Sequence, residues 1–311
     1  MTTSAPATTA SSRRGRIVAI LSLLGATLFW AGNYIVGAEV VHDVDPLSLV
    51  LLRWSIAVVP LLLLAHATER PDWRAAIRSW PWLVALCATG LAGYNLLLYS
   101  ALQFIGAFDA GLINAFNPAL IVLAAAVLLH QPLTRRSVGG VLVALVGVLV
   151  VLTDGAPWLV LTNGFGTGQL LMIGAITAWT AYTILGRLAP PIPPIASTSL
   201  QALIAVIGLA PLVLLTGGPS LPSTGTGWWA LLFIAVFPSV LSYPLWNRAL
   251  TALPAGSAGV FLNLITVFTT AFTIAAGHPW TYAELLGGVA VIGGVTLANL
   301  RPRRLSTPAE A

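Results

Sequence analysis

The sequence has no lysine, a single cysteine and few charged residues of either sign. Of its 311 residues, 7% are charged and 58% are hydrophobic, whereas a soluble domain carries roughly 25% charged residues. Cys87 by itself can form neither an intrachain disulfide nor a cysteine-based zinc site. This composition excludes an ordinary soluble domain and indicates a chain that lies almost entirely within a lipid bilayer.

The sequence also lacks the motifs that common hydrolases and intramembrane proteases require. It contains no HExxH, no GxSxG and no pair of aspartates within an apolar segment. Four histidines lie at the ends of apolar segments, where they cannot converge on one buried site, namely His42, His66, His130 and His278. We therefore expect no enzyme activity, no metal site and no cofactor.

Apolar segments that can each cross a bilayer core of about 30 Å fill most of the chain. Their number and length, about ten segments of roughly 20 residues, predict an all-α integral membrane protein. The first segment continues beyond the usual core of a signal peptide, so we interpret it as an uncleaved first helix. The predicted spans are 17–37, 46–65, 82–102, 108–129, 138–153, 168–187, 196–216, 228–249, 257–276 and 282–300.

Short motifs predict where some of these helices begin. Asp45 before Pro46 is typical of a helix start with a capping carboxylate and a proline at the first helical position. Thr281 and Glu284 form the pattern of a capping box that opens the last span. Between the second and third spans, segment 67–81 has the arginine and tryptophan spacing of a short helix lying on the membrane surface.

The net charge of +5 comes from fourteen arginines, and their positions indicate the orientation of the chain. If the amino terminus lies in the cytoplasm, every arginine except Arg53 falls on the cytoplasmic side, and the outside loops contain none. Arg53 lies within the second span. We therefore predict a multi-pass protein of the inner or plasma membrane with both termini in the cytoplasm, and we expect no nucleic acid as a partner.

The two halves of the chain share residues at a nearly constant separation. A shift of 148 places Gly139-Gly140 on Gly287-Gly288, and a shift of 149 places Trp30 on Trp179. Because each half has five spans, an odd number, the second half enters the membrane from the opposite side. Inverted repeats of this kind are typical of transporters, with the substrate site between the halves. The predicted organisation is a cytoplasmic tail (1–15), a first repeat (16–153), an external linker (154–166), a second, inverted repeat (167–300) and a cytoplasmic tail (301–311).

Two five-helix halves, each opening with a tryptophan-containing helix and closing with a glycine-rich one, resemble the EamA branch of the drug/metabolite transporter superfamily. The motifs that carry the resemblance are FWAGNYIVG (29–37), LLRWSIA (51–57), AGLINAFNPALIVLAAAVLLHQPLT (110–134) and GGVLVALVGVLVV (139–151), with AWTAYTILGR and GGVAVIGGVTLANL in the second half. The resemblance covers nearly the whole chain outside the two tails. It implies the ten-helix fold of that superfamily and the transport of a small solute across the membrane.

Within this branch, the aromatic residues of the spans make the sequence most similar to YddG-type exporters of aromatic and other hydrophobic amino acids. The family commonly has Gly-Glu just after the fourth and ninth helices. This sequence has His130-Gln131 and His278-Pro279 at those places, so no role of that glutamate carries over.

Neutral polar and aromatic side chains take the place of charge in the middle of the spans. No acidic residue lies deep in the first helix, so the sequence favours facilitated transport over coupling to protons. Asn and Tyr can bind the charged groups of an amino acid, and aromatic faces can cover an aromatic ring or attract a cation. We predict alternating access around a central substrate-binding pocket formed by Trp179, Tyr99, Tyr182, Tyr243, Asn114, Asn247 and Asn263, with Tyr94, Asn33 and Trp30 at its edge.

Several alternatives stay open at this point. Each of these polar or aromatic residues could instead hold helices together. For Arg53 an ion pair with one of the acids Glu39, Asp43, Asp45 or Asp109, or snorkelling toward the outer face, is favoured over a substrate contact. The transported solute is an amino acid or similar metabolite, or alternatively an organic cation or drug; a channel would share the composition. Small residues of the glycine-rich helices fit a monomer or a homodimer.

Overall fold

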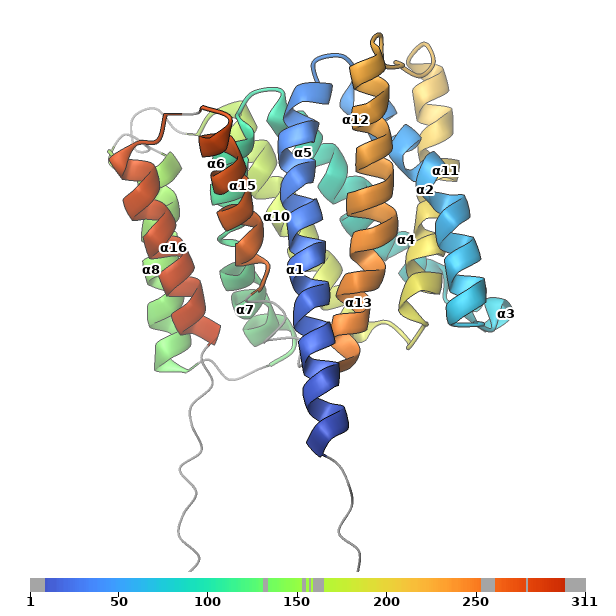
Figure 1. The fold of residues 1–311 in the computed structure, drawn as a ribbon, viewed down its shortest axis with the longest axis horizontal. Coiled ribbons are helices and arrows are strands. Elements are labelled where there is room, and N and C mark those ends of the chain that lie inside the picture. Colours follow the sequence, from blue (N-terminus) through green and yellow to red (C-terminus); the bar gives the residue numbers. More distant parts are fainter. Residues whose placement is uncertain are drawn as a thin grey trace, which may run out of the picture.

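The computed structural model describes residues 9–130, 134–152, 155–156, 158, 165–252, 261–277 and 279–299. Within this part of the chain the regular structure is helical, with no strand (Figure 1). The helices are α1 (Thr9–Val40), α2 (Pro46–Thr68), α3 (Trp73–Arg78), α4 (Trp80–Leu86), η1 (Cys87–Tyr94), α5 (Asn95–Leu102), α6 (Ala107–Asn114), α7 (Asn117–Leu128), α8 (Arg135–Leu152), α10 (Thr167–Leu188), α11 (Pro194–Leu215), α12 (Gly225–Ala235), η3 (Val236–Leu241), α13 (Ser242–Ala252), α15 (Asn263–Ala275) and α16 (Tyr282–Asn299).

Seven helical segments of the described chain are long and apolar enough to cross a membrane. They are 15–40, 46–68, 80–102, 107–128, 167–188, 194–215 and 225–246, and they coincide with seven of the predicted spans. Helices α8, α15 and α16 lie where the other three are predicted, although the first residues of the ninth predicted span are outside the described residues. The all-helical membrane architecture is thus confirmed, and the number of ten spans stays a prediction.

The predicted helix starts are present. The Asp45 carboxylate accepts the amide N–H of Ser48 at 2.9 Å, directly before Pro46 in the first turn of α2. Thr281 and Glu284 bond reciprocally: the Thr281 amide donates to Glu284 Oε2 at 2.6 Å, and the Glu284 amide donates to Thr281 Oγ1 at 3.2 Å. In segment 67–81, a helix covers Trp73–Arg78 and is capped by the Asp72 side chain.

Several spans change their helical geometry near their middle. The fourth span is interrupted at residues 115–116, between α6 and α7, just before Pro118. The third and eighth spans each contain a stretch of wider π-helix, η1 and η3. In η3, Pro238 lacks an N–H, and two neighbouring serines bond carbonyls five residues back: Ser239 to Ile234 and Ser242 to Phe237. Such breaks free backbone carbonyls inside the bundle.

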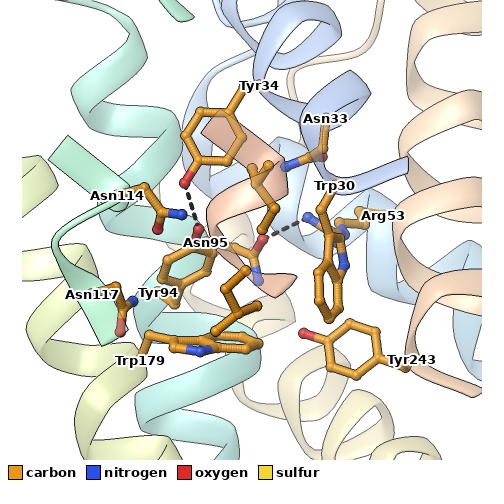
Figure 2. A pocket seen from close by; sticks show the side chains of 12 residues that line it. Trp30, Asn33, Tyr34, Arg53, Tyr94, Asn95, Asn114, Asn117, Trp179 and Tyr243 are labelled. Carbon is orange, nitrogen blue, oxygen red and sulfur yellow. Dashed lines mark hydrogen bonds between the residues drawn. The ribbon is translucent and has the colours of Figure 1, made fainter. Parts of the chain in front are cut away.

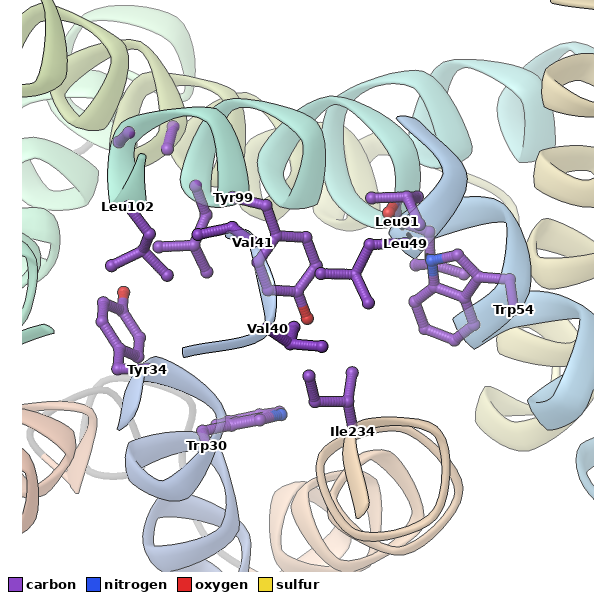
Figure 3. Packing of buried hydrophobic residues seen from close by; sticks show 14 of the residues in the cluster. Trp30, Tyr34, Val40, Val41, Leu49, Trp54, Leu91, Tyr99, Leu102 and Ile234 are labelled. Atoms are coloured by element: carbon purple, nitrogen blue, oxygen red, sulfur yellow. Dashed lines mark hydrogen bonds between the residues drawn. The ribbon is translucent and has the colours of Figure 1, made fainter. Parts of the chain in front are cut away.

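Helices from one half of the chain pack mainly on helices from the other half. Helix α2 pairs with α11, and α8 pairs with α16; these two pairs form opposite edges of the bundle in Figure 1. Between them, α1 packs on α13 and α15, while α10 packs on α5 and α7. The main hydrophobic core lies where these helices meet, with Trp30 and Tyr34 of α1, Trp54 of α2 and Tyr99 of α5 buried in it (Figure 3).

Candidate functional site

A cavity lies at the centre of this core (Figure 2). Its walls come from both halves of the chain and are mostly aromatic or neutral polar. The lining residues are Trp30, Asn33, Tyr34, Arg53, Tyr94, Asn95, Asn114, Asn117, Trp179, Tyr243, Leu262 and Ile265. The cavity volume is about 30 Å³, enough for about two or three water molecules. This volume is too small for a metabolite, so the lining side chains would need to move apart to admit one.

One wall of the cavity is a continuous set of aromatic rings. The Trp179 ring lies 5.0 Å from Tyr94, 5.1 Å from Tyr182 and 6.1 Å from Trp30, measured between ring centroids. The Trp30 ring in turn meets Tyr243 at 5.8 Å, edge to face. Trp30 Nε1 donates to the Pro238 carbonyl at 3.0 Å, so the broken helix η3 fixes this ring. Aromatic contacts of this geometry are favourable and hold the wall together.

A buried arginine, Arg53, also belongs to the lining and lies beside Trp30 in Figure 2. Arg53 is 2% exposed. Its Nε donates to Ser239 Oγ at 2.7 Å, and its Nη1 donates to Asn95 Oδ1 at 2.5 Å and to the Tyr99 hydroxyl at 2.7 Å. The Tyr99 hydroxyl donates onward to Asn33 Oδ1 at 2.8 Å. The guanidinium carbon lies 5.0 Å from the centre of the Trp54 ring.

The ion pair predicted for Arg53 is therefore wrong. All its hydrogen-bond acceptors in the described chain are neutral. Asp43 instead binds Ser223, and Asp45 caps α2; Glu39 and Asp109 do not bond to Arg53 either. Snorkelling is also wrong, because the side chain is buried among α2, α5 and η3. No local pattern could indicate these partners, because Ser239, which accepts from Nε, is 186 residues away along the chain.

The structure brings most of the predicted pocket residues together. Six of them line the cavity: Trp30, Asn33, Tyr94, Asn114, Trp179 and Tyr243. Tyr99 lies behind the lining, between Arg53 and Asn33 (Figure 3). Tyr182 supports the Trp179 ring from the side. Their assignment as substrate-binding residues stays a proposal.

Besides Tyr99 and Tyr182, two further predicted residues are not among the residues that line the cavity. Asn263 opens α15 and is buried, and neither polar atom of its amide has a hydrogen-bond partner within the described residues. Its neighbours Leu262 and Ile265 line the cavity instead. Asn247 belongs to α13, but its side chain is outside the described part of the structure.

The lining also contains polar residues that were not predicted as site residues. Asn95 lies four residues before Tyr99, and Asn117 lies three after Asn114, so helical spacing places each beside a predicted residue. Tyr34 lies four residues after Trp30, and its hydroxyl bonds the Tyr94 hydroxyl at 2.8 Å. This spacing is the signal that could have identified all three.

Several proteins of similar sequence are named as transporters or exporters. Over 282 residues, the chain is 28% identical to a Bacillus subtilis protein named uncharacterized transporter YyaM, covering 90% of this chain and 92% of the relative. It is 26% identical to the aromatic amino acid exporter YddG of Ancylobacter novellus over 72% of this chain and 78% of that one. It is 27% identical to a probable terminal-alkyne amino-acid exporter of Streptantibioticus cattleyicolor, over 93% and 97%.

A solved crystal structure has the same fold, with a TM-score of 0.67 at 22% identity, over 92% of this chain and 97% of the other. The sequence model of the EamA-like transporter family matches this chain twice, at residues 17–153 and 166–300. These matches include every described residue of the cavity lining. With its apolar helices and its relatives named as transporters, the chain is a multi-pass membrane transporter and belongs to the EamA-like transporter family.

Proposed function

We propose that this transporter exports small amphiphilic metabolites, above all aromatic and hydrophobic amino acids, through the central cavity. The observation that carries the proposal is the pairing of an aromatic wall with neutral amides in one buried site. The rings of Trp179, Tyr94 and Trp30 suit an apolar or aromatic side chain. The amides of Asn33 and Asn114 suit the polar end of an amino acid. Two relatives named as amino-acid exporters support this substrate class.

Alternating access between two inverted halves is the proposed mechanism. It is supported by the reciprocal packing of the helices: α1 of the first half packs on α13 and α15, and α10 of the second half packs on α5 and α7. Such an exchange is what a two-fold relation between the halves would produce. The small cavity between them is the expected position of a site that opens to each side in turn.

Transport is proposed to be facilitated. The described lining residues include no Asp, Glu or His, the side chains that usually relay protons inside membranes. In reconstituted vesicles, an outward gradient of phenylalanine should therefore drive flux that saturates with concentration. An imposed proton gradient should neither be required nor cause accumulation. Accumulation against the phenylalanine gradient would contradict facilitated transport, and flux without saturation would indicate a channel.

An organic cation is the second candidate substrate. Trp30, Tyr94, Trp179 and Tyr243 present several aromatic faces to one small cavity, and such an arrangement can attract an ammonium group. Competition separates the two candidates. If the flux of phenylalanine is inhibited by other hydrophobic amino acids and not by quaternary ammonium compounds, the amino-acid proposal stands. If quaternary ammonium compounds inhibit it and hydrophobic amino acids do not, an organic cation is the substrate.

A further inference from the structure

We propose that Arg53 binds the carboxylate of the transported solute, which makes the cavity a site for aromatic and hydrophobic carboxylates, amino acids included. The inference rests on the proposed function and narrows its substrate class. It also separates the two candidate substrates, because an organic cation has no group that this arginine can bind.

The charge of Arg53 is buried without a carboxylate beside it in the described chain. Its acceptors, Ser239, Asn95 and Tyr99, replace water as hydrogen-bond partners but carry no negative charge. A charged group in the middle of a membrane protein is costly, and such groups pair with each other or mark the path of a substrate. Since Arg53 lines the cavity, an anionic solute bound there can supply the missing charge.

The guanidinium has donors left for such a solute. Arginine carries five N–H groups: one on Nε and two on each terminal nitrogen. The three bonds described above use the Nε group and both groups of Nη1. Both N–H groups of Nη2 therefore remain for a ligand. A carboxylate on a guanidinium makes short, charge-assisted hydrogen bonds, which are stronger than bonds between neutral groups.

The arginine is also held in one orientation. Each acceptor that binds it is fixed by a second hydrogen bond: Ser239 donates to the Ile234 carbonyl, Asn95 to the Leu91 carbonyl and Tyr99 to Asn33. The rings of Trp54 and Tyr99 lie 5.0 Å and 6.0 Å from its guanidinium carbon. A donor group that is already fixed before the ligand binds is typical of a preorganised binding site.

The aromatic wall completes the recognition. In Figure 2, Arg53 and Trp30 lie side by side at one side of the cavity, and Trp179 and Tyr94 lie at the other. A solute with its carboxylate on Arg53 would direct its apolar part toward these rings. Asn33 connects the hydrogen bonds around Arg53 with the cavity, since it accepts a hydrogen bond from Tyr99 and also lines the cavity.

The first test uses the unmodified protein and four ligands that share a phenyl ring. Phenylalanine and hydrocinnamate carry a carboxylate, whereas phenylalaninamide and phenethylamine do not. Binding to the purified full chain, followed by quenching of tryptophan fluorescence, should be about 10- to 100-fold weaker for the two ligands without a carboxylate. Equal binding of phenylalanine and phenylalaninamide would overturn the proposal.

The second test uses variants. Arg53→Gln should remove the preference for carboxylates, and Arg53→Lys, which keeps the charge but loses the rigid fork, should restore part of it. The control Arg74→Gln removes the same charge on α3 and should leave the preference unchanged. Arg53→Gln protein that keeps the wild-type preference would overturn the role of Arg53 and leave amino-acid export intact.

A different result would contradict the proposed function itself. If the unmodified protein binds phenethylamine and neither phenylalanine nor hydrocinnamate, both the export of amino acids and the carboxylate site are wrong. Should Arg53→Gln not fold, the four-ligand series on the unmodified protein decides the question alone.

Discussion

At the scale of single residues, Trp179 occupies the centre of the aromatic wall. Its ring contacts Trp30, Tyr94 and Tyr182. Trp179→Ala removes both ring contact and apolar area, so the affinity for aromatic amino acids should fall by about 1–2 kcal/mol, or about 5- to 30-fold. Small amino acids, which cannot reach the ring, should lose less. The measurement compares wild type with Trp179→Ala. In each protein, the concentrations of phenylalanine and of alanine that half-inhibit transport of one labelled amino acid are determined.

Two further variants show whether the contrast belongs to the site. Trp229→Ala removes a ring that is 72% exposed on α12 and should leave the preference unchanged. Asn114 lies in the cavity lining. Asn114→Leu should weaken the binding of all amino acids to a similar extent, because the amino and carboxylate groups that the amide would bind are common to them. If the Trp179 variant reaches the membrane in normal amount and keeps its preference, the aromatic wall serves packing only.

At the scale of helices, two carboxylates tie the ends of α2 to α11 and its neighbours. Beyond the carboxyl end of α2, Glu69 accepts the amide N–H groups of Ile195 and Ala196, at the start of α11. Before its amino end, Asp43 accepts the Ser223 amide at 2.9 Å and the Ser223 hydroxyl at 2.5 Å. These bonds hold one end of α2 beside the start of α11 and the other end beside the loop that follows α11.

The link at Asp43 should be insensitive to pH in the neutral range. The hydroxyl and the amide of Ser223 stabilise the ionised form and lower the pKa of Asp43 below its ordinary value. Stability from a lowered pKa is present above the unfolded value, about 3.9, and is lost only as the pH falls through the lower folded value. Between about pH 5 and pH 8 the carboxylate stays charged, and the link persists.

Hydrogen–deuterium exchange checks this prediction. Asp43→Asn should speed exchange in segment 217–224, whereas lowering the pH from about 8 to about 5 should not, after correction for the intrinsic exchange rate. Glu39→Gln is the matched control, because it removes an exposed acid four residues before Asp43. This variant should leave exchange in segment 217–224 unchanged. Exchange that rises in the wild type over this pH range would show that Asp43 does not hold the segment.

At the scale of the whole molecule, the arginines predict which end of the bundle faces the cytoplasm. Figure 1 shows α3, with Arg74 and Arg78, at the same end as the start of α1, opposite the loop between α1 and α2. With Cys87 replaced by serine, cysteines at Ala156 and Thr226 should react with an impermeant reagent from outside. Cysteines at Ser137 and Ser306 should not. The opposite labelling would reverse the orientation and the proposed direction of transport.

Local chemistry allowed the sequence alone to determine the class of fold. A span is recognised from the hydropathy of consecutive residues, and a helix start from groups three residues apart, as in Asp45 with Ser48 and Thr281 with Glu284. The polar and aromatic composition of the site could be predicted for the same reason, since Trp30, Asn33, Asn114 and Trp179 stand out in apolar surroundings.

Only the tertiary structure decided which of these residues meet and what Arg53 binds. In a membrane, both the lipid-facing and the buried sides of a helix are apolar, so hydrophobic periodicity does not tell which side of α15 Asn263 occupies. The partners of the central residues are also distant in sequence: Ser239 for Arg53 and Pro238 for Trp30 belong to the other half of the chain. No local pattern encodes contacts that form only when two separate helices pack, and those contacts place a buried positive charge beside the cavity.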